Sequence, residues 1–283
     1  MHITLILLAI GIACTLRFVH SPTPRSPLPT PHSPLPPTPL LAFLLPPLLL
    51  LTTTIAVLCM GTEGQMLGLP VGWVGYSLAI GFLGFAGGLL LKSLVQGWRS
   101  VRQLQSYPLI KFNGTTGRLL ESPSLFAAQV GFWQPELVIS QGLLNTLSSE
   151  QLAAVLAHEQ AHSYHRDTFW FFWLGWLRQM TAWLPCTNAL WQELLLLREL
   201  RADRWAAQQV DPLLLAESLL LAVQHPVMED QYCAAFGTTS IDRLEERINA
   251  LLDESRPPET SQSLAWIGLL LGFAPLLTMF FHT

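Results

Sequence analysis

The residues best suited to chemistry are the five of His158-Glu159-Gln160-Ala161-His162. Residues four apart lie on one face of a helix, so His158 and His162 can direct both imidazoles at one metal ion. In this HExxH pattern the two histidines bind Zn²⁺, and the glutamate accepts a proton from water at the metal. Five positions also match by chance in unrelated chains, so the surrounding sequence has to support the prediction.

The sequence before the motif is typical of a helix start. Ser148 can cap the first turn, with the Gln151 side chain reaching back as in a capping box. We expect a helix from about Ser149 to His165 that stops near Asp167. The alternative is a helix that carries two unrelated surface histidines. The predicted buried stripe consists of Leu152, Val155, Leu156 and Ala157.

Zinc hydrolases usually have a third protein ligand and leave the fourth position to water. The pattern HExxHxxGxxH would need Gly at 165 and His at 168, where this chain has His165 and Thr168. His165 is poorly spaced to join the same metal, and a position in the last helical turn suits an exposed histidine. The third ligand is therefore expected further along the chain.

Glu199 is the better candidate, in a second helical stretch. Asp203 lies four residues later on the same face, where one carboxylate can bind zinc and the other can accept the free N–H of a zinc-bound histidine. Glu193 is a weaker alternative because no carboxylate follows four residues on. The other reading is an exposed helix with Glu–Arg pairs, formed by Arg198, Arg201 and Arg204.

The longer string GFWQPELVISQGLLNTLSSEQLAAVLAHEQAHSYHRD, followed by RELRADRWA, resembles the integral membrane gluzincin metallopeptidases. The resemblance is to the HtpX and CaaX-prenyl-protease type and to the BlaR/MecR type, and it covers roughly residues 117–206, with a weaker match to about 252. It implies one Zn²⁺ per chain. The implied ligands are His158, His162 and Glu199, with Glu159 as general base and Asp203 supporting a ligand.

Two short strands are expected before the motif helix. Apolar and polar residues alternate from Leu125 to Val130, Gly131–Pro135 turns the chain, and Leu137–Ile139 follows as a second strand. In gluzincins an edge strand beside the active-site helix pairs with an extended substrate, which binds peptides without reading much of their sequence. A purely structural hairpin is the alternative.

The composition indicates a membrane protein, because 51% of the residues are hydrophobic and only 12% are charged, against about 25% charged in soluble domains. We expect spans at 1–18, 40–60, 66–91 and 263–281, a proline-rich linker at 19–39 and a peptidase domain at 92–262. The first segment is short for a span and has the alternative of a signal peptide. Glycines in the third span either admit a neighbouring helix or reflect the usual composition of membrane helices.

Lysine and arginine near the span ends predict the orientation. The first linker carries Arg17 and Arg25, the short second loop has neither residue type, and Lys92 and Arg99 follow the third span. An N-terminus outside and a cytoplasmic catalytic domain satisfy this pattern, in a plasma or inner membrane.

The tryptophan-rich segment 168–185 has three interpretations: a buried core helix, an interfacial helix or a short re-entrant element. The tryptophans favour a helix at or just inside the membrane surface. His225 and Tyr232 are both candidates for a donor to the transition state, and the sequence does not choose between them. The four cysteines form no CxxC pair, and a net charge of −4 without a basic patch makes nucleic acid an unexpected partner.

We therefore expect a mainly α-helical fold, with several membrane spans, a gluzincin-like zinc peptidase domain and a small β-hairpin or sheet beside the HExxH helix. The expected function is a membrane-bound zinc metalloendopeptidase that acts on proteins or peptides, in membrane protein quality control. One alternative is a BlaR-type signalling protease that cleaves a cytoplasmic repressor, with its sensor in a separate protein. The other is a non-catalytic membrane scaffold with a relic site.

Overall fold

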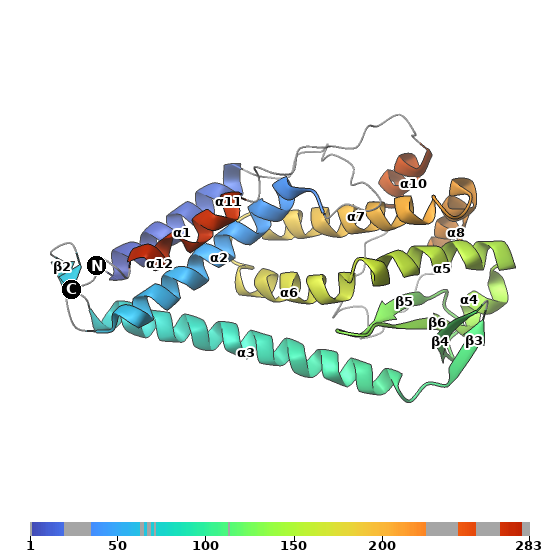
Figure 1. Ribbon diagram of the computed structural model, residues 1–283, viewed down its shortest axis with the longest axis horizontal. Coiled ribbons are helices and arrows are strands. Elements are labelled where there is room, and N and C mark those ends of the chain that lie inside the picture. Colours follow the sequence, from blue (N-terminus) through green and yellow to red (C-terminus); the bar gives the residue numbers. More distant parts are fainter. Residues whose placement is uncertain are drawn as a thin grey trace.

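The computed structural model describes residues 2–19, 35–62, 65–66, 69–70, 72–112, 114–224, 243–252 and 267–278. The described chain is mainly helical, with a helical bundle at one end and a small sheet with further helices at the other (Figure 1). His225, Tyr232, Cys233 and most of the proline-rich linker lie outside the described residues. The linker prediction differs at one end, because a helix already begins at Pro37.

Among the described residues, three helices are long and apolar enough to cross a membrane: α1 (His2–Val19), α2 (Pro37–Met60) and α3 (Trp73–Leu104). They indicate a membrane-embedded protein. The third helix differs from the predicted range, because it begins later than Met66 and continues past Lys92. Two short strands, β1 (Gln65–Met66) and β2 (Leu69–Pro70), pair where the span was expected to start.

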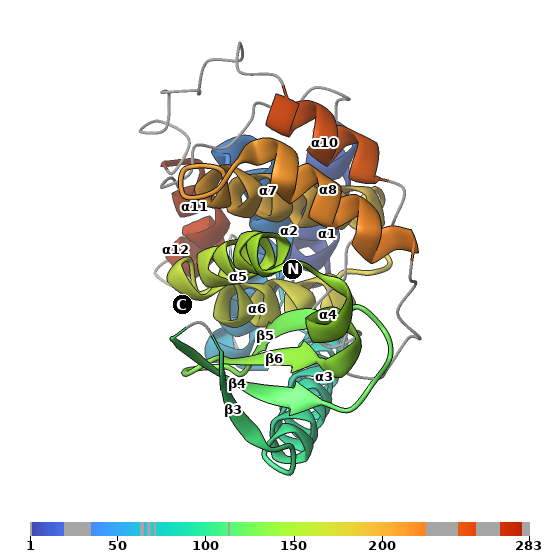
Figure 2. The same cartoon turned by 90° about the vertical axis from the view of Figure 1, so that its right-hand side faces the viewer.

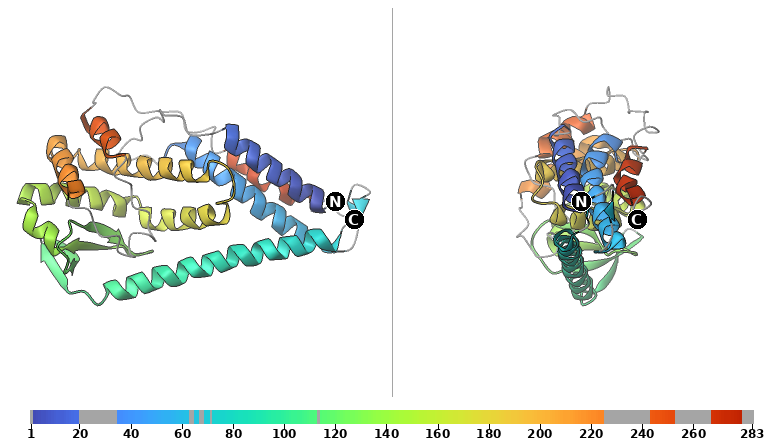
Figure 3. Two further views of the ribbon diagram at one scale, coloured as in Figure 1. Left: turned by 180° about the vertical axis from the view of Figure 1, so that it is seen from behind. Right: turned by 90° about the vertical axis from the view of Figure 1, so that its left-hand side faces the viewer.

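The part of the fourth predicted span that is described forms α11 (Ile267–Leu270), η2 (Leu271–Phe273) and α12 (Ala274–Leu277). These short elements lie along α2 (Figures 1 and 3). The Thr52 hydroxyl donates a 2.6 Å hydrogen bond to the Gly272 carbonyl oxygen. A Cβ at Gly272 would lie 3.2 Å from Leu48 Cβ, so glycine permits this close approach.

A four-stranded sheet stands at the far end of α3. Its strands are β3 (Leu109–Phe112), β4 (Thr115–Leu120), β5 (Ala127–Val130) and β6 (Glu136–Ser140), in the order β3-β4-β6-β5. The predicted hairpin is confirmed as antiparallel β5 and β6, with Gly131 at φ +135°, a backbone conformation that favours glycine. The sequence reading missed β3 and β4, because β4 joins the sheet through a parallel, non-adjacent pairing with β6.

The predicted motif helix is confirmed as α5 (Ser149–Tyr164), which follows the short α4 (Gln141–Thr146). Its capping box is present: the Gln151 amide donates to the Ser148 hydroxyl, and the Ser148 amide donates to the Gln151 side-chain oxygen. Leu152, Val155 and Leu156 pack on a cluster beneath the sheet, whereas Ala154 and Ala157 pack on the helices opposite. The helix is thus buried on two sides.

The described helices at this end of the molecule, besides α5, include α6 (Asp167–Met180), α7 (Thr187–Ala206), α8 (Pro212–Gln224) and α10 (Leu244–Leu252). Viewed end on, α5 lies between the sheet and the layer of α7, α8 and α10 (Figure 2). α6 shares a core with α2 and α7 and lies beside α3. The reading of α7 as an exposed helix is wrong, because most of its residues are buried, Arg201 included.

Candidate metal centre

His158 and His162 face each other across one turn of α5. Their Nε2 atoms are 3.2 Å apart, and ligand-type atoms of these residues and Glu159 all lie within 4.8 Å of one another. His158 and Glu159 are buried, and His162 is half-buried. The helix spacing therefore brings the two rings together as expected.

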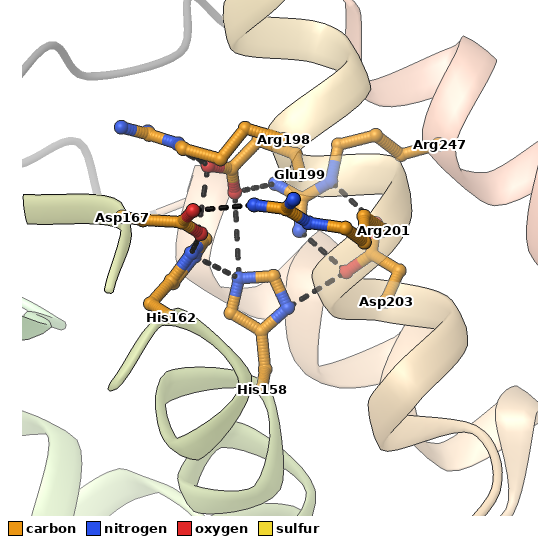
Figure 4. A network of polar contacts seen from close by, with 8 residues as sticks. All are labelled: His158, His162, Asp167, Arg198, Glu199, Arg201, Asp203 and Arg247. Carbon is orange, nitrogen blue, oxygen red and sulfur yellow. Dashed lines mark hydrogen bonds and ion pairs between the residues drawn. The ribbon is translucent and has the colours of Figure 1, made fainter. Parts of the chain in front are cut away.

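Glu199 joins them from α7. One carboxylate oxygen lies 3.3 Å from His158 Nε2, and the other lies 3.6 Å from His162 Nε2 (Figure 4). Glu193 is engaged elsewhere, because its carboxylate accepts a 3.1 Å hydrogen bond from Arg243. His165 is half-buried with its ring against Tyr164. Of the candidates for a third ligand, the structure brings Glu199 to the histidines.

Each histidine ring has a carboxylate at its other nitrogen. Asp203 Oδ1 lies 2.8 Å from His158 Nδ1, as the four-residue spacing from Glu199 predicts. Asp167 Oδ2 lies 2.8 Å from His162 Nδ1, and the sequence reading missed this pair. Arg166 adopts a left-handed conformation, φ 53°, between α5 and α6, and this turn returns Asp167 toward the helix that it follows.

Arg201 and Arg247, which are buried, and the half-buried Arg198 form ion pairs with the carboxylates of the site. Arg247 from α10 donates two 2.7 Å hydrogen bonds to Asp203 and lies 3.4 Å from Glu199. Arg201 donates a hydrogen bond to Asp167, and Arg198 forms a 2.7 Å ion pair with Glu199. Arg247 is buried and forms ion pairs with both Glu199 and Asp203. No local pattern distinguishes these arginines from surface ones.

The electrostatics of the cluster favour a cation between the rings. Burial opposes a charge on His158, but the charge and hydrogen bond of Asp203 outweigh it and raise the pKa of His158 to about 10. Burial also disfavours a charge on Glu199, yet Arg198, His162 and His158 hold the pKa of that carboxyl well below its ordinary value. Glu199 is thus ionised and able to bind a metal.

Glu159 differs from the other carboxylates of the site. Burial raises the pKa of Glu159, and the nearby histidines only partly offset this effect. A carboxylate with a raised pKa is a better proton acceptor near neutral pH. The environment of Glu159 therefore suits a base, whereas that of Glu199 suits a ligand.

The residues present fit a zinc ion. Two nitrogen ligands of one tetrahedral zinc, each at about 2.0–2.1 Å, are about 3.3 Å apart, and the observed Nε2–Nε2 separation is 3.2 Å. Carboxylates behind both histidines are also what a zinc site needs to fix ring orientation. Figure 4 shows the carboxylates of Asp167, Glu199 and Asp203 with the guanidinium groups that pair with them, and the Glu159 carboxyl group is a further oxygen donor beside the two histidines.

The described chain is mainly helical, has three helices of membrane type, and brings two histidines and several carboxylates together in a group that could hold a metal ion. Residues 111–195 match the sequence model of Peptidase family M48. The match covers less than half of the chain and supports a metallopeptidase, since enzymes of that family are metal-dependent hydrolases. It includes His158, Glu159 and His162 and ends before Glu199. A search of curated proteins finds no match.

Proposed function

We propose that this chain is a membrane-bound zinc metalloendopeptidase. The proposal rests on one observation: the Glu199 carboxylate lies beside the Nε2 atoms of His158 and His162, and an aspartate lies at the Nδ1 atom of each ring. His158, His162 and Glu199 would hold one zinc ion, and His225 and Tyr232 remain candidates for a donor to the transition state. When bound, zinc polarises the scissile carbonyl and lowers the pKa of a water molecule to about 7.

Glu159 acts as the general base. Its carboxylate takes the proton of the attacking water and later delivers it to the nitrogen of the leaving amine. The raised pKa of Glu159 supports both transfers, because a proton taken up from water is retained until the amine departs. Asp203 and Asp167 keep the Nδ1–H groups of the two histidines engaged, so that both Nε2 atoms stay directed at the metal.

An extended substrate would pair with β5. This strand ends the order β3-β4-β6-β5, so no described strand pairs along its outer edge. It lies against α5, the helix that carries the motif. Main-chain hydrogen bonds at such an edge bind unfolded segments of varied sequence, which suits a role in the quality control of membrane proteins. The M48 match favours neither a repressor-cleaving signalling protease nor an inactive scaffold.

The test is cleavage of casein by the full chain, purified in detergent and loaded with zinc, beside a Glu159→Gln variant. We expect the native chain to cleave casein and the variant to retain zinc but to lose turnover by at least about a hundredfold, as for loss of a general base. Metal analysis confirms that both proteins are loaded. Equal cleavage by both would remove Glu159 from this role, and none by either would reject the peptidase.

A further inference from the structure

The turn between α6 and α7 reaches the middle of the membrane-type bundle. Leu184, in this turn, is buried in a cluster with Ala9 and Ala13 of α1 and with Leu49 and Leu50 of α2. These partners stand near the middle of their helices, His2–Val19 and Pro37–Met60. A second cluster, made by Ala56, Val57, Met60 and Ala79, fills the half of the bundle nearer the N-terminus of α3, and none of its residues comes from α6 or α7. The turn between α6 and α7 therefore lies beside the midpoints of α1 and α2.

α3 gives an independent measure of this depth. The Trp176 indole N–H of α6 donates a 2.9 Å hydrogen bond to the Ala86 carbonyl oxygen of α3. At a rise of about 1.5 Å per residue, Trp73 and Trp98 lie about 20 Å and about 18 Å from Ala86 along the helix. Both indoles are exposed, 71% and 54%, and Arg102 lies over the Trp98 ring at 4.0 Å. Their spacing matches two aromatic belts across a bilayer about 40 Å thick with its headgroups, and it places Ala86 near the middle.

Several polar side chains near the turn of the hairpin formed by α6 and α7 find partners within the protein, as a lipid environment demands. The Arg178 guanidinium donates to the Asn188 side chain and lies over the Trp191 ring at 5.3 Å. The hydroxyl groups of Thr181 and Thr187 donate to main-chain carbonyls of the same hairpin. Gln179 donates to Ser93 of α3. Ala182 and Trp183, both exposed in the turn, offer an apolar surface.

We propose that this hairpin enters the bilayer turn first, as a re-entrant element whose turn lies in the hydrocarbon core. Asp167, the first residue of α6, lies nine residues before Trp176, or about 14 Å along the helix, which is close to the edge of a hydrocarbon core about 30 Å thick. Because Asp167 holds His162, the metal centre lies at the level of the lipid headgroups. In Figure 3, α6 runs alongside α3, and the turn between α6 and α7 reaches the bundle of apolar helices.

Exposed tryptophans mark the same level. Trp170 is in the first turn of α6 and is 58% exposed, and Trp133, in the turn between β5 and β6, is 73% exposed. Both flank Phe169, with ring centroids 5.2 Å away in each case. Tryptophan is enriched at membrane–water interfaces. One end of the substrate-edge strand β5 therefore meets the bilayer surface, and, given the proposed peptidase function, peptide bonds close to that surface are its substrates.

The depth of the hairpin is tested without an activity assay. In a full-length chain with Cys14, Cys59, Cys186 and Cys233 changed to Ala, a nitroxide spin label is attached at Ala182→Cys and the protein is reconstituted in vesicles of phosphatidylcholine and phosphatidylglycerol. Phe85→Cys on exposed α3 is the lipid reference, and Glu150→Cys at the start of α5 is the water reference. Relaxation by oxygen and by a water-soluble nickel chelate reports the depth.

We expect the label at 182 to follow Phe85→Cys, with oxygen access and little access to nickel. Access to nickel equal to that of Glu150→Cys would overturn the proposal. Ala189→Cys, in the first turn of α7, provides a second position if the first variant does not fold, with the same two outcomes.

A second assay separates the substrate inference from the hairpin. Two single-span substrates carry one unstructured segment, either directly after the span or behind a long Gly/Ser linker. We expect the adjacent segment to be cleaved about tenfold faster, by proximity. Equal rates would overturn the surface preference. Cleavage of neither, with the spin label buried, would reject the proposed peptidase and with it the substrate inference, while the inserted hairpin would stand.

Discussion

Both histidines of the site have an aspartate at Nδ1, but the two aspartates come from different parts of the chain. His158 is backed by Asp203 and Arg247, which come from α7 and α10, far along the chain. His162 is backed by Asp167, five residues away, and by Arg201. Arg247 grips its aspartate with two hydrogen bonds, whereas Arg201 makes one. One histidine therefore depends on long-range packing, and the other on a local turn that starts the proposed membrane hairpin.

This difference predicts which substitutions disturb each histidine. We call His158 with Asp203 and Arg247 the His158 side, and His162 with Asp167 and Arg201 the His162 side. The His158 side should respond to the docking of α10 and α7. The His162 side should respond to the conformation of Arg166 and to the position of α6, because Asp167 is the first residue of that helix. Perturbing each side separately can show whether the two are equivalent.

The largest expected effect on folding comes from Arg247→Ala. Removing this buried guanidinium leaves Asp203 without its two hydrogen bonds and removes a positive charge 3.4 Å from Glu199. Breaking a buried pair from one side destabilises a protein by about 3–5 kcal/mol. Thermal unfolding in detergent should show a clearly lower midpoint, with Arg243→Ala as the control, because Arg243 is more exposed and pairs with Glu193. Equal decreases in the unfolding midpoint would contradict the claim that the buried Arg247 contributes more to stability than Arg243.

Replacing the two aspartates compares the two sides directly. Asp203→Ala and Asp167→Ala should each weaken zinc binding by about 10–100-fold, the usual effect of losing a carboxylate behind a histidine ligand. We expect the greater loss for Asp203, because Arg247 holds it with two hydrogen bonds. Competition with a metal chelator measures the affinity, and Asp211→Ala on the surface serves as control. A larger loss for Asp167 would reverse the ranking of the two sides.

The sequence predicts the locally encoded half of this site and misses the rest. Helical spacing pairs His158 with His162 and Glu199 with Asp203, and a capping signal at Ser148 marks the helix start. Asp167 was not predicted, because a five-residue spacing lies on no common helix face and depends on the left-handed turn at Arg166. Arg247 approaches from another helix, and such long-range contacts have no periodic signal. The same limit hid the parallel pairing of β4 with β6.

The smallest expected effect concerns the cap of α5, which both histidines share. Ser148→Ala removes the hydroxyl that accepts from the Gln151 amide, and such a loss typically costs about 1 kcal/mol of stability. We expect a slightly lower unfolding midpoint and unchanged zinc affinity, whereas Ser148→Asp should keep the cap. A loss of zinc affinity in Ser148→Ala would mean that the whole helix shifts, and the two sides could then not be studied separately.

X-ray absorption at the zinc edge of the full native chain, beside Glu199→Ala and Glu193→Ala, tests the metal centre most directly. The account predicts one zinc per native chain, with two imidazole nitrogens and carboxylate oxygen at about 2.0–2.2 Å. It also predicts loss of stoichiometric zinc in Glu199→Ala and an unchanged spectrum in Glu193→Ala. Stoichiometric zinc with an unchanged spectrum in Glu199→Ala would contradict the assignment of the third ligand, and no zinc in the native chain would contradict the metal centre itself.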